Sequence, residues 1–329
     1  MTDPSEDEHG YLTELPEDLR MRRAAAARRR RWRRRLAAGA LIAAAGVVVA
    51  LAVTSLGGNG GGSSSNHGKK AAQATGTVTT PGQQTTTTFP AGWKSHPGPV
   101  LILEYHAIQP PVAGSAYPQL FVPQADFQHQ MQWLYDHGYE AVTLDQVEAA
   151  WYEHGELPPK PIVVSFDDGY LSQYVAAFPE MQHLGWKGVL NLIAQGSDLP
   201  DADVKKMVDA GWELASHTIT HADLTTLGSA QLQREVSGSR AILRKRFGVP
   251  VDNFCYPSGR YDSTVIAAVH TAGYVGAESE IPGLASATHP YILNRIEIEN
   301  SDGLSGFIQK LQAAEAGTTS TTTTPTTTG

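Results

Sequence analysis

The sequence predicts an α/β fold, in which a parallel sheet of about seven to eight strands closes into a barrel, preceded by one transmembrane helix. Two observations carry this prediction. Short apolar runs alternate with helical patterns through residues 96–316, a rhythm typical of parallel sheets. An uncharged segment at residues 36–56 precedes that region. In a closed barrel of this kind the chemistry lies at the carboxyl ends of the strands.

The uncharged segment is the first element along the chain. As a helix, residues 36–56, LAAGALIAAAGVVVALAVTSL, would be about 30 Å long, which matches the hydrocarbon thickness of a bilayer. The segment is too long and too far from the start for an ordinary cleaved signal peptide, although the small residues at 52–54 leave cleavage open. An Ala-rich buried helix is the alternative. We therefore expect a signal anchor that holds the chain in the cytoplasmic membrane.

An arginine-rich tail precedes the anchor and predicts its orientation. Residues 1–35 carry seven acidic side chains within 1–19, followed by ten arginines and no acid within 20–35. Positive residues beside a membrane helix favour the cytoplasmic side, so we expect a single pass with the remaining chain outside. Contact of these arginines with nucleic acid or anionic lipid is the alternative.

Two low-complexity segments frame the globular region. Residues 57–95 are rich in Gly, Ser and Thr, and residues 317–329 are nearly all Thr, so both are expected to be disordered. Composition leaves glycosylation of the threonines open. The remaining residues, 96–316, number about 220, enough for one large domain with a sizeable core.

The charge of the exported part argues against a nucleic-acid partner. Beyond the arginine-rich tail the chain has 15 basic and 26 acidic residues, a net charge of about −11 with neutral histidine. No basic stripe with interleaved aromatic residues is present. Cys255 is the single cysteine, so no disulfide framework exists and the domain depends on its core.

The first half of the domain predicts four strands and three helices. The strands are VLILEY (100–105), EAVTL (140–144), PIVVSF (161–166) and GVLNLIA (188–194). The helices are expected near 124–137, 145–154 and 171–184.

The second half continues the alternation. The strands are WELAS (212–216), VDNFCY (251–256), YVGAES (274–279) and ILNRIEI (292–298). The helices are expected at 201–210, 229–247, 263–272 and 304–315. Asp201 is the expected cap of the first of these helices, and Gly211 follows its end.

Ionisable or turn-forming residues follow four of the strands. They are Glu104-Tyr105-His106, Asp167-Asp168-Gly169, His217 with His221, and Tyr256-Pro257-Ser258-Gly259. Each motif alone has a structural explanation: Asp-Asp-Gly is a common turn, the histidine pair could be chance, and a lone His106 could be a core residue. Because the strand ends meet at one rim, their convergence predicts a site.

One aspartate and two histidines offer a facial site for a divalent ion such as Zn²⁺. A bound metal lowers the pKa of its water from about 15.7 to about 7. Hydrolysis then needs a base for the water and an acid for the leaving group. The second aspartate can therefore serve as the base.

SFDDG (165–169), SHTITH (216–221) and FCYPSG (254–259) resemble, in this order, motifs one to three of the polysaccharide deacetylases, the NodB-homology domain of carbohydrate esterase family 4. The resemblance covers roughly residues 98–300. It implies a distorted (β/α) barrel that removes acetyl groups from N-acetylated glycans, or O-acetyl groups from xylan in some members. It implies a divalent metal, with zinc the first choice and cobalt, nickel, manganese or iron as alternatives.

The resemblance also implies roles for individual residues. Asp167 would be the catalytic base. Asp168, His217 and His221 would bind the metal. The turn formed by Tyr256, Pro257, Ser258 and Gly259 would line the acetate pocket, with the backbone N–H near Ser258 stabilising the oxyanion.

The chain departs from the family pattern in three places. Cys255 stands where the third motif usually has an arginine, YVGAESE lacks the usual fourth motif, and no late Leu-x-His supplies the acid. LEYHAI (103–108) instead resembles the branch of poly-N-acetylglucosamine deacetylases, in which an N-terminal histidine is the acid, so His106 inherits that role. Arg295 in YILNRIEI is the candidate that replaces the missing arginine by orienting Asp167.

The expected function is removal of N-acetyl groups from an N-acetylglucosamine polysaccharide of the cell envelope or extracellular space, with release of acetate. Two alternatives remain open: an esterase for O-acetyl groups of xylan, and a non-catalytic glycan-binding wall protein. A glycosidase is disfavoured because its two carboxylates flank a bond at about 5 to 9.5 Å, whereas adjacent strand residues point in different directions.

Overall fold

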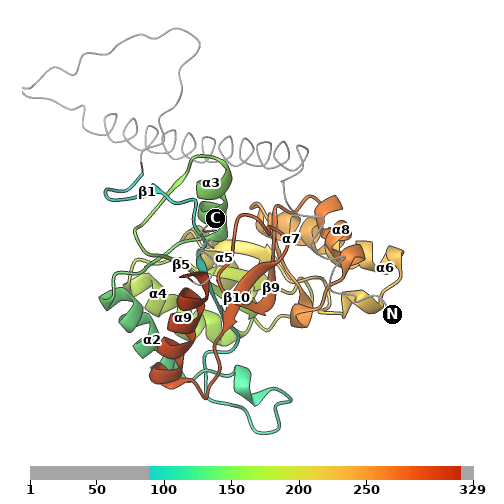
Figure 1. The fold of residues 1–329 in the computed structure, drawn as a ribbon. Helices are drawn as coiled ribbons and strands as arrows, with labels where there is room; N and C mark the ends of the chain where they lie inside the picture. Colours follow the sequence, from blue (N-terminus) through green and yellow to red (C-terminus); the bar gives the residue numbers. More distant parts are fainter. Residues whose placement is uncertain (1–88, 320–329) are drawn as a thin grey trace, which may run out of the picture. The chain divides into compact units, whose positions relative to one another are not determined.

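The strands form a closed parallel barrel in the computed structural model, which describes residues 89–319 (Figure 1). Seven strands follow one another around the ring in the order β2, β10, β9, β8, β7, β6 and β5, and β5 pairs with β2 to close it. Their bounds are β2 Leu101–Tyr105, β5 Pro161–Asp168, β6 Val189–Leu192, β7 Glu213–Ser216, β8 Asn253–Cys255, β9 Gly276–Pro282 and β10 Leu293–Glu297. The predicted parallel barrel is confirmed.

The barrel is irregular, as the resemblance implied. β7 and β8 pair only through Ser216 and Phe254, and the β9–β10 register shifts between Leu293 and Arg295. A short strand, β3 (Glu140–Ala141), pairs with the start of β5 outside the ring. A separate antiparallel pair, β1 (Lys94–Ser95) with β4 (Glu156–Leu157), was not expected from the sequence.

Helices surround the barrel. In Figure 1, α2, α4 and α9 lie on one side of the strands, and α6, α7 and α8 on the other. The α-helices are α2 Gln124–Asp136, α3 Leu144–Tyr152, α4 Phe178–His183, α5 Asp201–Asp209, α6 Ser229–Gln233, α7 Ser239–Phe247, α8 Ser263–Thr271 and α9 Gly303–Thr319. Shorter helical turns are η1 Pro118–Leu120, η2 Gln173–Ala177, η3 Leu224–Thr226, η4 Arg234–Gly238 and η5 Pro257–Gly259.

Several element boundaries differ from the prediction. The strand expected at 140–144 ends at Ala141, because Thr143 and Gln146 form a capping box that begins α3. The short π-helices η2 and η4 interrupt the α-helices expected at 171–184 and 229–247. The cap of α5 is Pro200, so the prediction that Asp201 caps this helix was wrong. Helix α9 continues to Thr319, past the expected domain end at residue 316.

Alternation along each strand separates two hydrophobic regions. On β2, Leu101, Leu103 and Tyr105 belong to the cluster packed against the helices, whereas Ile102 belongs to a second cluster. Val163, Val189 and Leu293 join Ile102 in that second cluster, which fills the barrel. Because side chains alternate between the faces of a strand, residues at the same parity also point inward.

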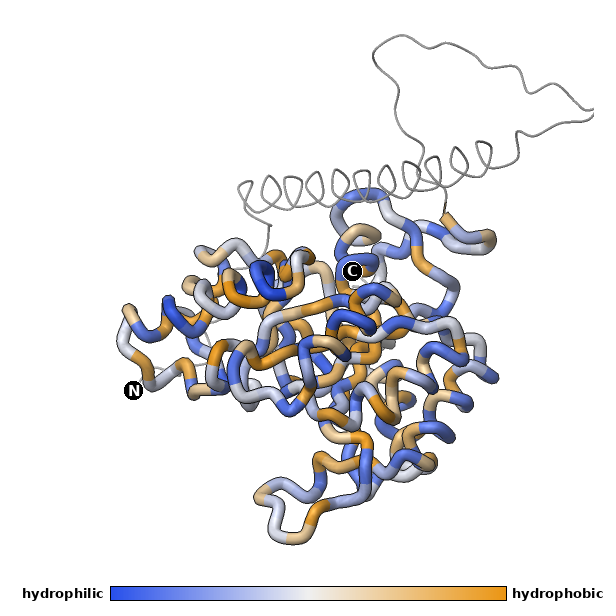
Figure 2. The backbone as a smooth tube through the Cα atoms, turned by 180° about the vertical axis from the view of Figure 1, so that it is seen from behind, coloured by the Kyte–Doolittle hydropathy of each residue, from blue (hydrophilic) through white to orange (hydrophobic). Residues whose placement is uncertain are grey.

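The barrel interior consequently has two layers. The lower layer is mostly apolar and includes Val100, Ile102, Val163, Val189 and Leu293, with one buried hydrogen-bonded polar pair, Glu213 and Asn253, at the level of Val189. The upper layer, towards the carboxyl ends of the strands, is polar and comprises Glu104, Ser165, Asp167, Asn191, Glu278 and Arg295, all at most 1% exposed. Figure 2 shows the apolar segments running through the centre of the domain. The polar layer therefore lies in the interior, beneath the rim where the motifs were expected to meet.

The membrane prediction concerns residues outside the described part. Residues 36–56, the arginine-rich tail and most of the linker precede residue 89, where the structural description begins. Within residues 89–319, none of the helices combines the length and apolar character needed to cross a bilayer. The signal anchor therefore remains a prediction.

Candidate active site

A cleft of about 540 Å³ opens at the carboxyl ends of the barrel strands. Six of the predicted site residues line it: His106, Asp167, Asp168, His217, His221 and Ser258. They come from the ends of β2, β5 and β7 and from η5, so the structure brings together motifs that are up to 152 positions apart, counted from His106 to Ser258. The expected convergence of the strand ends is therefore observed.

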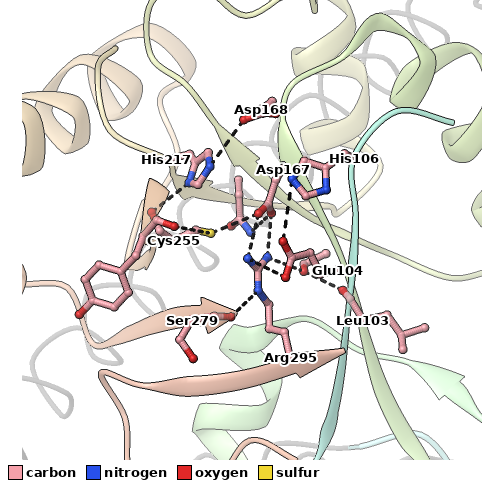
Figure 3. Close-up of polar contacts among 12 residues, drawn as sticks. Leu103, Glu104, His106, Asp167, Asp168, His217, Cys255, Ser279 and Arg295 are labelled. Carbon is pink, nitrogen blue, oxygen red and sulfur yellow. Dashed lines mark hydrogen bonds and ion pairs between the residues drawn. The ribbon is translucent and has the colours of Figure 1, made fainter. Parts of the chain in front are cut away.

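Asp168, His217 and His221 face one another at the cleft. Asp168 Oδ1 lies 3.6 Å from His217 Nε2 and 3.6 Å from His221 Nε2. His217 Nδ1 lies 2.9 Å from the carbonyl oxygen of Cys255, so this nitrogen is the donor and Nε2 is left with its lone pair towards Asp168 (Figure 3). This arrangement presents three ligand atoms to one point.

These three residues fit a divalent metal ion. Two ligands that each lie about 2.1 Å from one tetrahedral ion are about 3.4 Å apart, close to the observed separations. Asp168 Oδ1 is buried and has no hydrogen-bond partner among the described residues, an expensive state for a carboxylate without a cation. Burial lowers the pKa of His217 and of His221, which favours the neutral imidazole that metals bind.

Backbone strain accompanies this cluster. Among the described non-glycine residues, five have positive φ, and four of them belong to the site motifs: Asp168 at 72°, Thr218 at 67°, His221 at 58° and Ser258 at 51°. Such conformations cost about 1–3 kcal/mol each and persist where the surroundings impose them. Gly169 has φ +81°, and a Cβ there would collide with Ser197 and Leu192, so the glycine of Asp-Asp-Gly is required. The turn directs Asp168 towards His217 and His221 while Asp167 stays in the barrel.

Asp167, in contrast to Asp168, is surrounded by hydrogen-bond donors. Arg295 binds it with two hydrogen bonds, Nη1 to Oδ1 at 2.8 Å and Nη2 to Oδ2 at 2.9 Å (Figure 3). Asn191 Nδ2 donates to Oδ1 at 2.7 Å, and Cys255 Sγ lies 3.4 Å from Oδ2. Burial by itself raises the pKa of Asp167, but the charges of Arg295 and His217 outweigh burial and hold that pKa well below its usual range. Asp167 is therefore an ionised carboxylate aimed at the cleft.

Arg295 of β10 makes the contact with Asp167 that was predicted for it. Cys255, which stands in the third motif instead, has its Sγ against the same carboxylate, so both side chains touch Asp167. Arg295 is 1% exposed, and its Nε donates to the Ser279 carbonyl at 2.9 Å. The predicted contact between Arg295 and Asp167 is present; the orienting role stays a prediction.

His106 lies on the cleft wall near Asp167 and Glu104. It is 8% exposed, and its Nε2 is 3.9 Å from Glu104 Oε1. Burial lowers the pKa of His106 to about 4, although the charge of Asp167 opposes this shift. Gln173 Nε2 donates to the backbone carbonyls of both His106 and Asp167, at 3.0 and 2.5 Å, and fixes the two segments to each other.

The third motif contributes less to the cleft than expected. Ser258 lines it, whereas the Tyr256 side chain is fully buried in the core and its hydroxyl donates to the Tyr291 carbonyl at 3.0 Å. Pro257 and Gly259 are not among the residues that line the cleft. Any role of these three in substrate binding would therefore have to come from the backbone of η5.

Sequence reasoning missed part of the upper layer. Glu104 was noted only as a strand-end residue, and Asn191, Gln173 and Glu278 received no role. Glu104 and Asn191 could have been found from alternation, because each is a polar residue at an inward position of an otherwise apolar strand. Gln173 lies in a π-turn, for which the local sequence carries no clear signal.

Comparison with known proteins agrees with this geometry. The family model for polysaccharide deacetylases matches residues 154–277. YxkH of Bacillus subtilis (strain 168), described as a polysaccharide deacetylase, is 30% identical over 215 residues, which cover 64% of this chain and 74% of YxkH. The poly-β-1,6-N-acetyl-D-glucosamine N-deacetylase of Escherichia coli (strain K12) is 26% identical over 64% of this chain and 38% of the enzyme.

A solved structure supports the same assignment. The Streptococcus pyogenes deacetylase PplD, in complex with acetate, matches with a TM-score of 0.61 and 26% identity over 65% of this chain and 99% of PplD. Motifs, fold and relatives agree. The chain belongs to the polysaccharide deacetylase family and is a deacetylase of the carbohydrate esterase family 4 type.

Proposed function

We propose that this protein hydrolyses N-acetyl groups of an N-acetylglucosamine-containing polysaccharide of the cell envelope or extracellular space and requires a divalent metal, zinc being the first choice. The observation that carries the proposal is the contrast between the surroundings of two neighbouring aspartates in one cleft. Asp168 faces the ring nitrogens of two histidines, and Asp167, one residue earlier, is held ionised by Arg295. The E. coli relative named as an N-deacetylase supports the choice of an amide substrate.

The metal-binding residues would be Asp168, His217 and His221. When bound there, the ion would polarise the acetyl carbonyl and make a water molecule acidic enough to react near neutral pH. Asp167, kept ionised by Arg295, takes a proton from the attacking water. The backbone N–H groups of η5 near Ser258 stabilise the negative charge that develops on the carbonyl oxygen.

His106 lies where it can protonate the departing nitrogen. An amine is a poor leaving group unless it gains a proton, so cleavage of an amide demands an acid more strongly than cleavage of an ester. His106 lines the same cleft as Asp167 and offers that acid. This requirement favours N-deacetylation over the alternative, removal of O-acetyl groups from xylan.

The proposal extends to location. The anchor expected at residues 36–56, with the arginine-rich tail inside, would place the domain outside the cytoplasmic membrane, where such polysaccharides occur. The linker at 57–95 would allow the domain to reach its substrate. Protease protection of a C-terminal tag in intact cells would contradict this orientation.

One experiment tests the function. Full-length protein is incubated with N-acetylglucosamine oligomers and, separately, with acetylated xylan, each with and without a chelator, and released acetate is measured. We expect chelator-sensitive release from the oligomers, restored by added Zn²⁺. Release from xylan alone would favour the esterase, and no release from any acetylated glycan would refute a catalytic role on glycans.

A further inference from the structure

The upper layer of the barrel holds more acid than base. Arg295 is its single cation, while Asp167, Glu104 and Glu278 each carry a carboxyl group and are at most 1% exposed. Arg295 Nη2 lies 2.9 Å from Asp167 Oδ2 and 3.1 Å from Glu104 Oε2, so one guanidinium serves two carboxyls. A dry interior does not hold unmatched charges cheaply. Arg295 therefore balances one carboxylate, and a second acid must keep its proton or face another cation.

Glu104 is the acid that is free to exchange a proton. Four donor atoms, from Arg295, Asn191 and Cys255, surround the Asp167 carboxylate. The side chain of Glu104 is 0% exposed; its Oε2 is held only by the ion pair with Arg295, and its Oε1 has no hydrogen-bond partner among the described residues. Its Oε1 faces His106 Nε2 at 3.9 Å, and His106 Nδ1 is buried without a partner (Figure 3).

Glu104 and His106 have complementary proton preferences. Burial raises the pKa of Glu104 well above its usual value even though Arg295 opposes the shift, and burial lowers the pKa of His106 to about 4. A single proton can thus reside on the Glu104 carboxyl or on the imidazole. With Asp167 ionised and Arg295 charged, both placements leave these four groups with zero net charge.

We propose that Glu104 is a positioning residue that stores the proton which His106 delivers to the departing amine. The inference rests on the proposed function, because it concerns the acid step of the same reaction. It assigns a task to a buried acid that a purely structural barrel would not need at this position.

The proposed transfer conserves protons and charge. At the start Asp167 is ionised, Glu104 is protonated and His106 is neutral. The attacking water gives one proton to Asp167. Glu104 gives its proton to Nε2 of His106, whose Nδ1 already carries one, and the resulting imidazolium turns and passes that proton from Nε2 to the amine nitrogen as the C–N bond breaks. At the end Asp167 is protonated and Glu104 is ionised, so one negative charge has moved between two neighbours of Arg295. Proton exchange with solvent restores the starting state.

The present separation requires a small movement. A distance of 3.9 Å is longer than a hydrogen bond, so the ring must approach Glu104 by about 1 Å for the transfer. Catalytic hydrogen bonds are often long without substrate and shorten in the complex.

Other charged groups face this pair and bear on its titration. Arg295 and Glu297 of β10, Asp167 of β5 and Glu280 of β9 act on Glu104. Asp167, Arg295 and His221 act on His106. Among these groups of the described chain, Glu104 alone combines proximity to His106 Nε2 with a carboxyl oxygen, Oε1, that accepts no hydrogen bond, which makes it the group to change.

The test compares Glu104→Gln, Glu104→Asp and a matched control, Glu278→Gln, in the full-length metal-loaded enzyme. Glu278 is an equally buried acid of the upper layer on β9, and among the described residues the main charges that act on His106 are those of Asp167 and Arg295, not that of Glu278. Acetate release from N-acetylglucosamine pentamer is measured from pH 5 to pH 10, with thermal melting of each variant.

We expect Glu104→Gln to lower kcat about tenfold or more with KM changed less than twofold. The alkaline limb of kcat should move to lower pH, because His106 alone releases the proton more readily. Glu104→Asp should recover part of kcat and the original limb, and Glu278→Gln should leave the limb unchanged.

If Glu104 has only a structural role, Glu104→Gln will change the melting temperature but keep the pH profile of the wild type. That result would overturn the inference. A wild-type enzyme that releases no acetate would instead overturn the proposed function, and this inference with it. The two failures are therefore distinct.

Discussion

The two layers of the barrel interior are built on the same strands but obey different rules. In the lower layer, residues such as Ile102 and Val163 fill space and need only be apolar and of the right size. In the upper layer, Asp167, Glu104 and Arg295 replace that packing with charges that are stable only in combination. Under the proposed mechanism, the end of each strand that holds the charges would carry out the chemistry, and the apolar end would contribute mainly packing. Changes in the two layers should accordingly separate stability from activity.

The largest expected effect is on activity and comes from the upper layer. Asp167→Asn should reduce kcat by about 10²- to 10⁴-fold, because the variant cannot accept a proton from water. Zinc content, measured by atomic emission after gel filtration, should stay equal to that of the wild type, since Asp168, His217 and His221 are untouched. An active Asp167→Asn enzyme would remove the base from the mechanism.

A substitution in the lower layer should reduce stability and leave activity nearly unchanged. Ile102→Ala should reduce the free energy of unfolding by about 2–5 kcal/mol, because it leaves a cavity in a fully buried cluster. At a temperature where the variant remains folded, kcat should match the wild type within about twofold. Urea unfolding followed by fluorescence gives the first quantity, and acetate release gives the second. A large drop in kcat at full folding would mean that the layers are not separable.

Glu278→Gln should stabilise the protein, and the gain should depend on pH. Burial raises the pKa of Glu278 to about 7, against an ordinary value of 4.5, so the folded state holds the proton more firmly than the unfolded state. The stability due to this group is greatest at low pH and is lost as pH rises from about 4.5 to about 7. The variant should therefore gain up to roughly 3 kcal/mol over wild type at pH 8 and almost nothing at pH 4. Unfolding free energies at the two pH values provide the check, and an equal gain at both would contradict the assignment.

The smallest expected effect concerns the shape of the pH profile. Arg295→Lys keeps the positive charge but loses the two-point contact with Asp167, so the pKa of Asp167 should rise. Because the base must be ionised, the acidic limb of kcat/KM should move to higher pH, by about one unit. An unchanged limb would show that Arg295 does not tune the base. Asn191→Ala, which removes one neutral donor, offers a matched comparison with a smaller shift.

Much of the fold was predictable because alternation and apolar runs are local signals. The strand that leads into Asp167 and the cluster of Asp168, His217 and His221 followed from the motifs, and the structure brings the three cluster residues together. The Arg295–Asp167 contact was expected only through the family resemblance, since 128 positions separate the two residues. Glu104 was noted only as a strand-end residue, because the role of a buried acid in an apolar strand depends on its partners on other strands. The short π-helices η2 and η4 were not predicted either, because their hydrogen bonding depends on packing rather than on residue type.

The contact between Arg295 and Asp167 also has a consequence for biosynthesis. Arg295 lies on β10, the last strand in the described part of the chain and the one that joins β9 to β2. A growing chain that already contains every motif from His106 to Gly259 still lacks the cation that contacts Asp167. Under the proposed mechanism, activity would therefore require that β10 has closed the ring.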